Sequence, residues 1–297
     1  MILVTGGCGF IGSAFVLQWL GADKVTGQDK NGGQFPLWSA ELSAAMAAET
    51  RRFAAAVVFD GSGKLKELLT ADYSFLNEAL ARVYGIGGVS GVDLRKIPYG
   101  DGRRAGILSH GSVLASYAHS NQTSPVRRGL FVRRNVLCEE LPPPPPNAGA
   151  VPDVNSNATT RERFAQHTST PFCKSCHQYI DSIGLGFERF DAIGQYRETE
   201  NGKAVDPSGD LNDPLMLGER KSNPFSTLPQ LAQALAAAPR AEACFVQQAF
   251  RYARGYREEL ADQCTLSTLR TRFRESGGDI RELLVALTLT PDFVRRR

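Results

Sequence analysis

Along much of the chain, apolar and polar positions alternate with the period of an amphipathic helix. Residues 39–59 carry four positions on one helical face, namely Leu42, Met46, Thr50 and Phe53. Residues 64–86 repeat this spacing, with Ser74 as the expected N-cap. Met46 is expected to pack in the core, because methionine ordinarily fills gaps between helices. The pattern predicts core helices over both segments.

The second half of the chain contains further helix signals. Thr159 and Glu162 form a capping box at the start of residues 159–167. Three amphipathic segments follow near the C-terminus, at residues 240–255, 266–276 and 279–289, and Asp279 is the expected cap of the last one. These segments predict a small all-α bundle.

Two stretches interrupt the helical pattern. Residues 86–104 are rich in glycine and are expected to form a loop. Five consecutive prolines at 142–146 enforce an extended polyproline II segment that cannot enter a helix or a central strand. This segment is either a linker or a strap laid over the surface of a domain.

The N-terminus has a different pattern. Residues 2–5 predict a short strand, and residues 24–29 predict a second strand that ends at Asp29. Between the two strands lie three glycines, each three positions after the last: Gly6, Gly9 and Gly12. Such glycines allow a backbone to approach a pyrophosphate at a helix N-terminus, and an acidic residue after the second strand can bind a ribose. This stretch resembles the opening βαβ unit of the extended short-chain dehydrogenases, particularly the nucleotide-sugar dehydratases.

The rest of the chain does not continue that resemblance. None of the eight tyrosines has a lysine four residues later, so the Tyr-x-x-x-Lys pair of that family is missing. The alternation of strands and helices stops after Asn31, and a single βαβ unit cannot bury both faces of its sheet. NAD binding is therefore disfavoured, and we interpret residues 1–34 as a vestigial or foreign leader.

Composition restricts the class of protein. The chain has 297 residues, 42% of them apolar, and a net charge of +3, so it is expected to be globular and not to bind nucleic acid. No apolar run approaches the ~20 residues of a membrane-spanning helix. The first ten residues lack the basic residue that precedes the apolar stretch of a secretory signal.

The strongest chemical motif is Cys173-x-x-Cys176-His177. On a helix the two sulfurs project to the same side, where they can reach the two vinyl groups of one porphyrin, and the adjacent imidazole can bind the iron. This is the spacing used for covalent attachment of c-type haem. The residues that follow are expected to cover the macrocycle, and they are Ile180, Ile183, Gly184, Leu185, Gly186, Phe187 and Phe190.

Two other uses of the motif are less well supported. A structural zinc site needs four ligands, normally two Cys/His pairs, and no second pair occurs. A thioredoxin-like redox motif needs a βαβ context, which this helical region does not provide.

The distal iron ligand has several candidates. His167, six residues before Cys173, is the first, and its alternative role is a hydrogen bond to a propionate or to the backbone. Met216 is the second, since a thioether ligand raises the reduction potential relative to a second histidine. His110 and His119 are expected to be surface or cap residues. A five-coordinate iron, open to a substrate, is the remaining arrangement.

Other residues could support a haem protein. Four arginines could neutralise haem propionates or an acidic redox partner, or could form a solvated face: Arg127, Arg128, Arg133 and Arg134. Cys244 and Cys264 could form a disulfide, in keeping with an oxidising compartment, or remain free thiols. Cys8 and Cys138 have no evident partner.

From about Phe35 onwards the chain resembles the C-terminal part of the planctomycete- and myxobacterial-type cytochrome-c-like proteins, which are built from consecutive domains of unknown function. The resemblance is carried by several strings in the same order, including "GRRAGILSHGSVL", "TSPVRRGLFVRRNVLCEELPPPPPN", "FCKSCHQYIDSIGLGFERFDAIGQYR" and "CFVQQAFRYARG". It implies an exported haem protein of the cell envelope or periplasm. The N-terminus departs from that pattern, and we interpret the chain as the product of a truncated or chimeric gene.

Together these features predict a mainly α protein, with a helical cytochrome-c-like haem domain, a small helical bundle after it and an incomplete Rossmann-like βαβ fragment at the start. The expected divisions are residues 1–34, 35–98, 99–200 with the haem and the polyproline segment, and 201–297. The expected function is electron transfer by one covalent haem c with an unidentified redox partner. The alternatives are an NAD-dependent dehydratase or epimerase, and an envelope binding module in which the haem is structural.

Overall fold

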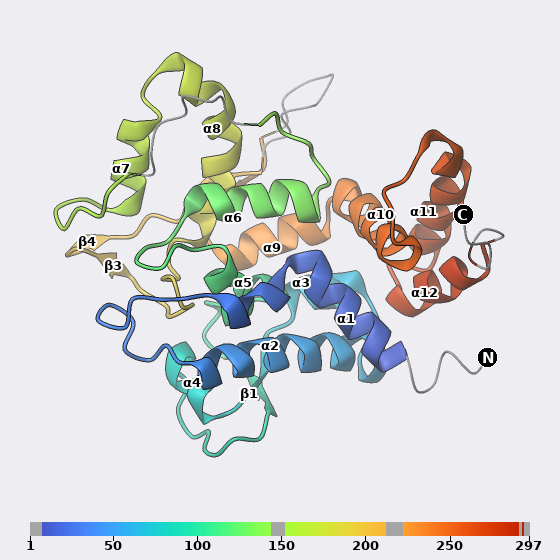
Figure 1. The fold of residues 1–297 in the computed structure, drawn as a ribbon, viewed down its shortest axis with the longest axis horizontal. Coiled ribbons are helices and arrows are strands. Elements are labelled where there is room, and N and C mark those ends of the chain that lie inside the picture. Colours follow the sequence, from blue (N-terminus) through green and yellow to red (C-terminus); the bar gives the residue numbers. More distant parts are fainter. Residues whose placement is uncertain (1–7, 144–151, 212–221, 291–292, 294–297) are drawn as a thin grey trace.

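The protein is mainly α-helical, as the sequence predicts (Figure 1). The computed structural model describes residues 8–143, 152–211, 222–290 and 293. The α-helices are α1 (Cys8–Leu20), α2 (Ala40–Ala55), α3 (Leu65–Thr70), α4 (Glu78–Tyr84), α5 (Gly111–Ser116), α6 (Pro125–Phe131), α7 (Thr160–His167), α8 (Pro171–Gly184), α9 (Leu228–Ala236), α10 (Pro239–Arg254), α11 (Gln263–Glu275) and α12 (Ile280–Thr288).

Shorter elements connect these helices. The 3₁₀ turns are η1 (Ala22–Gly27), η3 (Ile107–Ser109), η5 (Leu185–Phe187) and η6 (Leu260–Asp262), and the π-helical turns are η2 (Ala56–Asp60) and η4 (Val132–Val136). The strands are β1 (Tyr73–Leu76), β2 (Arg95–Pro98), β3 (Thr199–Glu200), β4 (Lys203–Ala204), β5 (Gly209–Asp210) and β6 (Pro224–Phe225). In the described ranges they form three two-stranded antiparallel ribbons, β1–β2, β3–β4 and β5–β6.

Helix α2 is the centre of the N-terminal part. Ser39 caps it by accepting a hydrogen bond from the Leu42 backbone N–H. The predicted face is buried, and both Met46 and Phe53 are fully buried. The prediction that Met46 packs in the core is confirmed.

The predicted second strand of a βαβ unit is not formed. Residues 22–27 are the 3₁₀ turn η1, in which Val25 is buried and packs in the same cluster as Leu42 and Met46. Burial of Val25 against α2 takes the place of pairing in a sheet. Asp29 is exposed.

The glycine motif is not a loop at the positions that the structure describes. Gly9 and Gly12 lie inside α1, whereas residues 2–5 and Gly6 lie outside the described residues. Helix α1 belongs to the common core, because the rings of Phe15 and Trp19 lie 5.3 and 4.9 Å from the ring of Phe245 in α10. Residues 13–20 therefore pack between distant segments of the chain.

Ser74 is not an N-cap. It lies in β1, opposite Ile97 of β2, and its side chain is fully buried. Helix α4 begins at Glu78, and its N-cap is Asn77, whose side chain accepts a hydrogen bond from the Leu80 N–H. The segment 64–86 thus contains α3, β1 and α4 instead of one continuous pattern of helix.

Helices α6 and α8 cross in close contact. A Cβ atom on Gly129 of α6 would overlap the carbonyl oxygen of Ile180, and a Cβ atom on Gly184 of α8 would overlap that of Pro125. Each helix thus places a glycine against the backbone of the other. Two hydrogen bonds of 3.1 Å from the guanidinium of Arg133, in the turn η4 that directly follows α6, to the Tyr179 carbonyl also hold α8 in place.

The C-terminal part is the predicted helical bundle. Helices α10 to α12 correspond to the three expected segments, and Asp279 caps α12 by accepting hydrogen bonds from Arg281 and Glu282 N–H groups. The predicted disulfide between Cys244 and Cys264 is not formed. Cys244 bonds to Cys138, and Cys264 is a free, exposed thiol. Folding brings Cys244 in α10 next to Cys138, which follows η4. The two cysteines are 106 positions apart, so their spacing in the sequence gives no sign that they pair.

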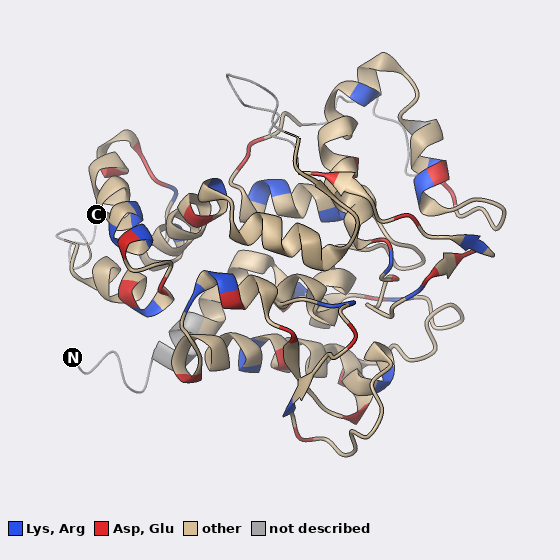
Figure 2. Cartoon of the chain, turned by 180° about the vertical axis from the view of Figure 1, so that it is seen from behind, with Lys and Arg blue, Asp and Glu red and all other residues tan. Residues whose placement is uncertain are grey.

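Positive and negative side chains are intermixed along the ribbon (Figure 2), in keeping with the small net charge. In the described part of the chain, no helix combines the length and the apolar character that crossing a bilayer requires.

Candidate functional site

The Cys-x-x-Cys-His motif occupies the first two turns of α8. Thr170 caps this helix by accepting a hydrogen bond from the Cys173 N–H, and Pro171 occupies its first turn, where a missing N–H is tolerated. The C-terminal half of α8 is buried, whereas the motif lies on the more exposed half. Phe172, beside the first cysteine, is 68% exposed. An exposed apolar ring therefore directly precedes the first cysteine in the sequence.

Both cysteines of the motif are free thiols. Cys173 and Cys176 are partly exposed and belong to no disulfide. Residues three positions apart on an α-helix lie on neighbouring parts of one face. The predicted arrangement, with two accessible sulfurs on one side of a helix, is therefore present.

Asp181 holds the imidazole of His177. The His177 Nδ1 lies 3.1 Å from each of the two Asp181 carboxylate oxygens. This hydrogen bond and the negative charge raise the pKa of His177 above its ordinary value, and partial burial opposes the shift. The sequence analysis did not identify Asp181. A carboxylate four residues after the histidine on a predicted helix is the signal that could have identified it.

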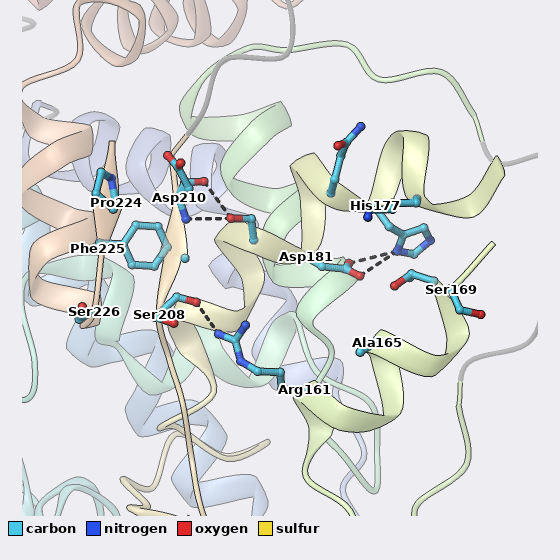
Figure 3. A pocket seen from close by; sticks show the side chains of 15 residues that line it. Arg161, Ala165, Ser169, His177, Asp181, Ser208, Asp210, Pro224, Phe225 and Ser226 are labelled. Carbon is cyan, nitrogen blue, oxygen red and sulfur yellow. Dashed lines mark hydrogen bonds and ion pairs between the residues drawn. The ribbon is translucent and has the colours of Figure 1, made fainter. Parts of the chain in front are cut away.

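His177 and Asp181 lie in the wall of a cavity of about 780 Å³ (Figure 3). Helix α7 forms one side of the cavity, α8 forms another, and β5 and β6 form the third. Its lining is mixed in character and includes Arg161, Ala165, Thr168, Lys174, Gln178, Ser182, Asp210, Pro224 and Phe225. A cavity of this size is in the range of small-molecule and cofactor sites.

Hydrogen bonds join the walls of this cavity. Arg161 of α7 donates to the Asp206 and Ser208 carbonyl oxygens, next to β5. Ser182 of α8 donates to the Asp210 carbonyl oxygen at 3.1 Å, and its hydroxyl accepts from the Asp210 N–H at 2.8 Å. Side chains of α7 and α8 thus bond to the backbone at β5 and tie both helices to the third side.

The residues expected to cover a macrocycle have a different role. Ile183, Phe187 and Phe190 are buried in the main hydrophobic core of the protein. Gly184 permits the contact between α8 and α6, and a Cβ atom on Gly186 would lie 2.6 Å from the Phe225 ring. The apolar positions after the motif therefore anchor the helix to the protein, because its C-terminal half lies over α6.

Both interpretations of the arginine cluster are wrong for Arg128 and Arg133. These two side chains are buried, and Arg133 pairs with Glu139 at 2.8 Å. Arg128 donates hydrogen bonds to the carbonyl oxygens of Phe187, Phe190 and Asp191 at 3.0, 2.8 and 2.7 Å. It stabilises the turn that follows α8 and does not face a ligand. Arg127 and Arg134 are exposed.

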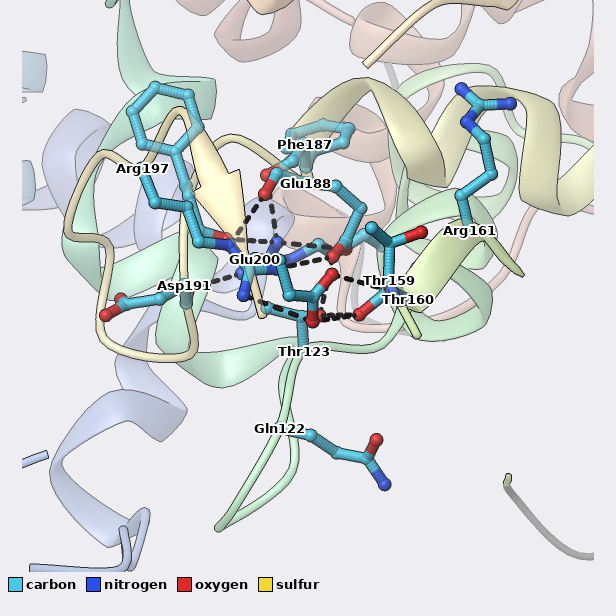
Figure 4. A network of polar contacts seen from close by, with 12 residues as sticks. Gln122, Thr123, Thr159, Thr160, Arg161, Phe187, Glu188, Asp191, Arg197 and Glu200 are labelled. Atoms are coloured by element: carbon cyan, nitrogen blue, oxygen red, sulfur yellow. Dashed lines mark hydrogen bonds and ion pairs between the residues drawn. The ribbon is translucent and has the colours of Figure 1, made fainter. Parts of the chain in front are cut away.

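A buried polar network continues from this turn (Figure 4). Glu188 accepts hydrogen bonds from Thr123 at 2.6 Å and from Arg197 at 3.0 Å. Glu200 accepts from the Thr160 N–H at 2.6 Å and from its hydroxyl at 2.8 Å. Because Thr160 is the first residue of α7, the network fixes the start of α7 relative to the end of α8.

The candidate distal ligands are placed only in part. His167 is the last residue of α7, and its side chain lies outside what the structure describes. Met216 also lies outside the described residues. His119 is partly exposed and its backbone N–H donates to Gln122.

His110 occupies the N-cap position of α5, as one of the two expectations has it, but its side chain makes no capping hydrogen bond and is not at the surface. Its backbone precedes α5, but its side chain is fully buried between Thr50, whose hydroxyl lies 3.0 Å from Nδ1, and Ser74, whose hydroxyl lies 3.2 Å from Nε2. Burial lowers the pKa of His110 to about 3. No local pattern in the sequence indicates that the hydrogen-bond partners of His110 come from α2 and β1.

The residues of α8 fit a covalent c-type haem. The site offers two free thiols one turn apart, an adjacent imidazole oriented by a carboxylate, and an exposed aromatic ring. Within the described residues, no three His, Cys, Asp or Glu side chains converge to form a metal site made of protein ligands alone. This arrangement suits attachment of a prosthetic group that brings its own equatorial ligands better than it suits structural zinc.

Three consecutive segments of the chain match models of protein families, each described as a protein of unknown function. Residues 9–86 match DUF1592, residues 104–200 match DUF1588 and residues 222–293 match DUF1585. The first match includes residues 9–20 of helix α1, and the second contains the whole Cys-x-x-Cys-His motif. The expectation of consecutive domains of unknown function is confirmed. No curated protein and no solved structure matches the chain.

Proposed function

We propose that this protein binds one c-type haem covalently and transfers electrons in the cell envelope. The observation that carries the proposal is the arrangement on α8, where Cys173 and Cys176 are accessible free thiols and the ring of His177 is held by Asp181.

Each residue has a defined role in this proposal. Cys173 and Cys176 would hold the porphyrin through thioether bonds, each thiol adding across one vinyl group, and His177 would bind the iron. Asp181 occupies the Nδ1 side of the ring, so the ligand nitrogen is Nε2. The haem supplies an iron that accepts and donates one electron at a time.

The exposed position of the motif favours electron transfer. Transfer between two proteins slows steeply with the distance between their cofactors. Attachment residues at the surface end of α8, beside the exposed Phe172, would keep that distance short.

The Cys138–Cys244 disulfide supports a location outside the cytoplasm. Disulfides persist in the periplasm and other oxidising compartments and are rare where thiols are kept reduced. Covalent haem attachment takes place in the same kind of compartment, so the two features favour one location.

The test is to produce the protein with an export signal in cells that carry a cytochrome c maturation system. We expect the intact mass to increase by that of one haem, and the colour to remain with the protein after denaturation and acid–acetone extraction. Replacing both motif cysteines, Cys173→Ala and Cys176→Ala, should abolish the added mass.

Cys264→Ala is the matched control, because Cys264 is also a free thiol but lies in α11. This variant should retain haem in full. An unmodified mass for exported, folded wild-type protein would refute covalent attachment, and haem loss in the Cys264 variant would refute the assignment to α8.

A further inference from the structure

The carboxylate of Asp181 suggests how the proposed iron site is tuned. Asp181 lies one helical turn after His177, so the two side chains lie on one face of α8. The Asp181 side chain is only 12% exposed, and both of its oxygens lie 3.1 Å from the His177 Nδ1. The imidazole is thus held by a charged acceptor that is largely withdrawn from water.

The position of this carboxylate is fixed by the fold. The Asp181 backbone carbonyl accepts a hydrogen bond from the Leu185 N–H at the end of α8. Three residues after Asp181, Gly184 lies against the backbone of α6. The residue after Asp181 is Ser182, whose hydroxyl donates to the Asp210 carbonyl and accepts from the Asp210 N–H. The backbone that carries the carboxylate is therefore fixed, and the bond to His177 holds the carboxylate itself in place.

We propose that Asp181 is a positioning residue that lowers the reduction potential of the iron bound by His177. This inference rests on the proposed haem function. A carboxylate that accepts the Nδ1 proton makes Nε2 a stronger electron donor, which favours the ferric over the ferrous state. Its negative charge acts in the same direction, because the ferric state carries one more positive charge.

The other charged side chains that line the cavity do not cancel the effect of Asp181 on the reduction potential. Arg161 lies across the cavity, but it is paired with Asp206 at 3.2 Å. Lys174 also lines the cavity and is exposed to solvent, which screens its charge. Asp210, the other acidic residue in the wall, is bonded to Ser222 and to the Asn223 N–H instead of the histidine.

The test is the midpoint potential of the haem-loaded full-length protein, titrated with reduced dye mediators that supply one electron per iron. Asp181→Asn keeps the shape of the side chain and removes the charge. We expect the potential to rise by at least a tenfold change in the reduction equilibrium, which is ~59 mV for one electron. Asp210→Asn is the matched control and should shift the potential much less.

The intact mass is measured first, so that two failures are distinguished. Wild-type protein without haem would refute the proposed function and this inference with it. Haem-loaded wild-type and Asp181→Asn proteins of equal potential would refute only the role of Asp181. Equal shifts in the Asp181 and Asp210 variants would also refute it, since a general charge effect would then suffice.

A measurement on the wild type covers the case in which Asp181→Asn fails to fold or to load. In the loaded, histidine-labelled protein, NMR should show the Nδ1 proton of His177 strongly downfield, as expected for a bond to a carboxylate. A signal that exchanges rapidly with water, or a shift typical of a carbonyl acceptor, would overturn the proposal.

Discussion

At the scale of single residues, the most unusual environment is that of Glu49. Its carboxylate is fully buried on α2 and accepts hydrogen bonds from the Ser74 hydroxyl at 2.6 Å and the Tyr84 hydroxyl at 2.7 Å. Burial raises the pKa of Glu49 to about 7, although these hydrogen bonds and the charge of Arg104 oppose the shift. His110 lies 3.9 Å away and remains neutral in the folded protein. The carboxyl therefore titrates near neutral pH inside the core.

Glu49→Gln should remove part of the pH dependence of stability. The folded pKa of about 7 lies above the unfolded value of 4.5, so the contribution of Glu49 is fully present below pH 4.5 and is lost as the pH rises through 7. Glutamine resembles the protonated side chain and carries no charge. Between pH 5 and 8, we expect the free energy of unfolding of wild type to fall by about 3 kcal/mol relative to the variant.

Urea denaturation at four pH values, followed by tryptophan fluorescence, measures this difference. The contribution of His110 has the opposite sign, is lost as the pH falls below 6.5 and is present in both proteins. Glu41→Gln is the control, because Glu41 is exposed on the first turn of the same helix and its pKa is lowered. Parallel pH profiles for wild type and Glu49→Gln would contradict the prediction.

At the scale of elements, the position of the motif depends on the crossing of α6 and α8. The two glycines, Gly129 and Gly184, allow the backbones to touch, and no side chain larger than hydrogen fits at either position. Helix α8 is thereby held at its C-terminal half, and one of its faces, with Lys174, His177 and Asp181, lines the cavity. The motif implies a helical turn around residues 173–177, but the sequence does not indicate which half of α8 is anchored.

Gly129→Ala should destabilise the protein strongly. The added methyl group would overlap the Ile180 carbonyl oxygen, and the helices would have to separate. We expect a loss of about 3 kcal/mol in the free energy of unfolding, despite the better helix propensity of alanine. Gly87→Ala is the matched control, since a Cβ atom there would meet no atom within 4 Å. Thermal denaturation followed by circular dichroism compares the two, and equal melting temperatures would show that the crossing tolerates a side chain.

At the scale of the whole molecule, one disulfide joins segments that match different families. Cys138 follows η4, Cys244 lies in α10, and 106 positions separate them in the sequence. Close by, the Trp19 indole N–H donates to the Asn135 carbonyl at 2.6 Å, and the Asn135 amide donates to the Trp19 carbonyl at 2.7 Å. Helix α1, η4 and α10 therefore meet at one junction that holds the N-terminal, middle and C-terminal parts together.

Breaking this disulfide should lower the stability of the whole molecule. Closing so long a loop restricts the unfolded chain, so we expect Cys138→Ala combined with Cys244→Ala to lower the free energy of unfolding by about 4 kcal/mol. Peptide mapping without reduction should recover a peptide pair that contains Cys138 and Cys244. A pair containing Cys244 and Cys264, or destabilisation by Cys264→Ala of the same size, would contradict the pairing.

The sequence by itself determined those features whose causes are local. Helix periodicity identified α2 and the C-terminal helices, and the capping residues Thr159 and Asp279 marked where two helices begin. The motif on α8 was identified because its chemistry depends on spacing within two turns. The sequence also places Asp181 four residues after His177, which on a helix brings the two side chains together, but this pair was not predicted.

Tertiary structure alone decided which chemically similar residues face one another. It paired Cys244 with Cys138, buried Arg128 and Arg133 against backbone carbonyls, and placed His110 beside Glu49. It also turned the segment predicted as a second strand into a 3₁₀ turn, because Val25 is buried against α2. These outcomes depend on contacts between residues far apart in the chain, and periodicity and spacing carry no information about such contacts.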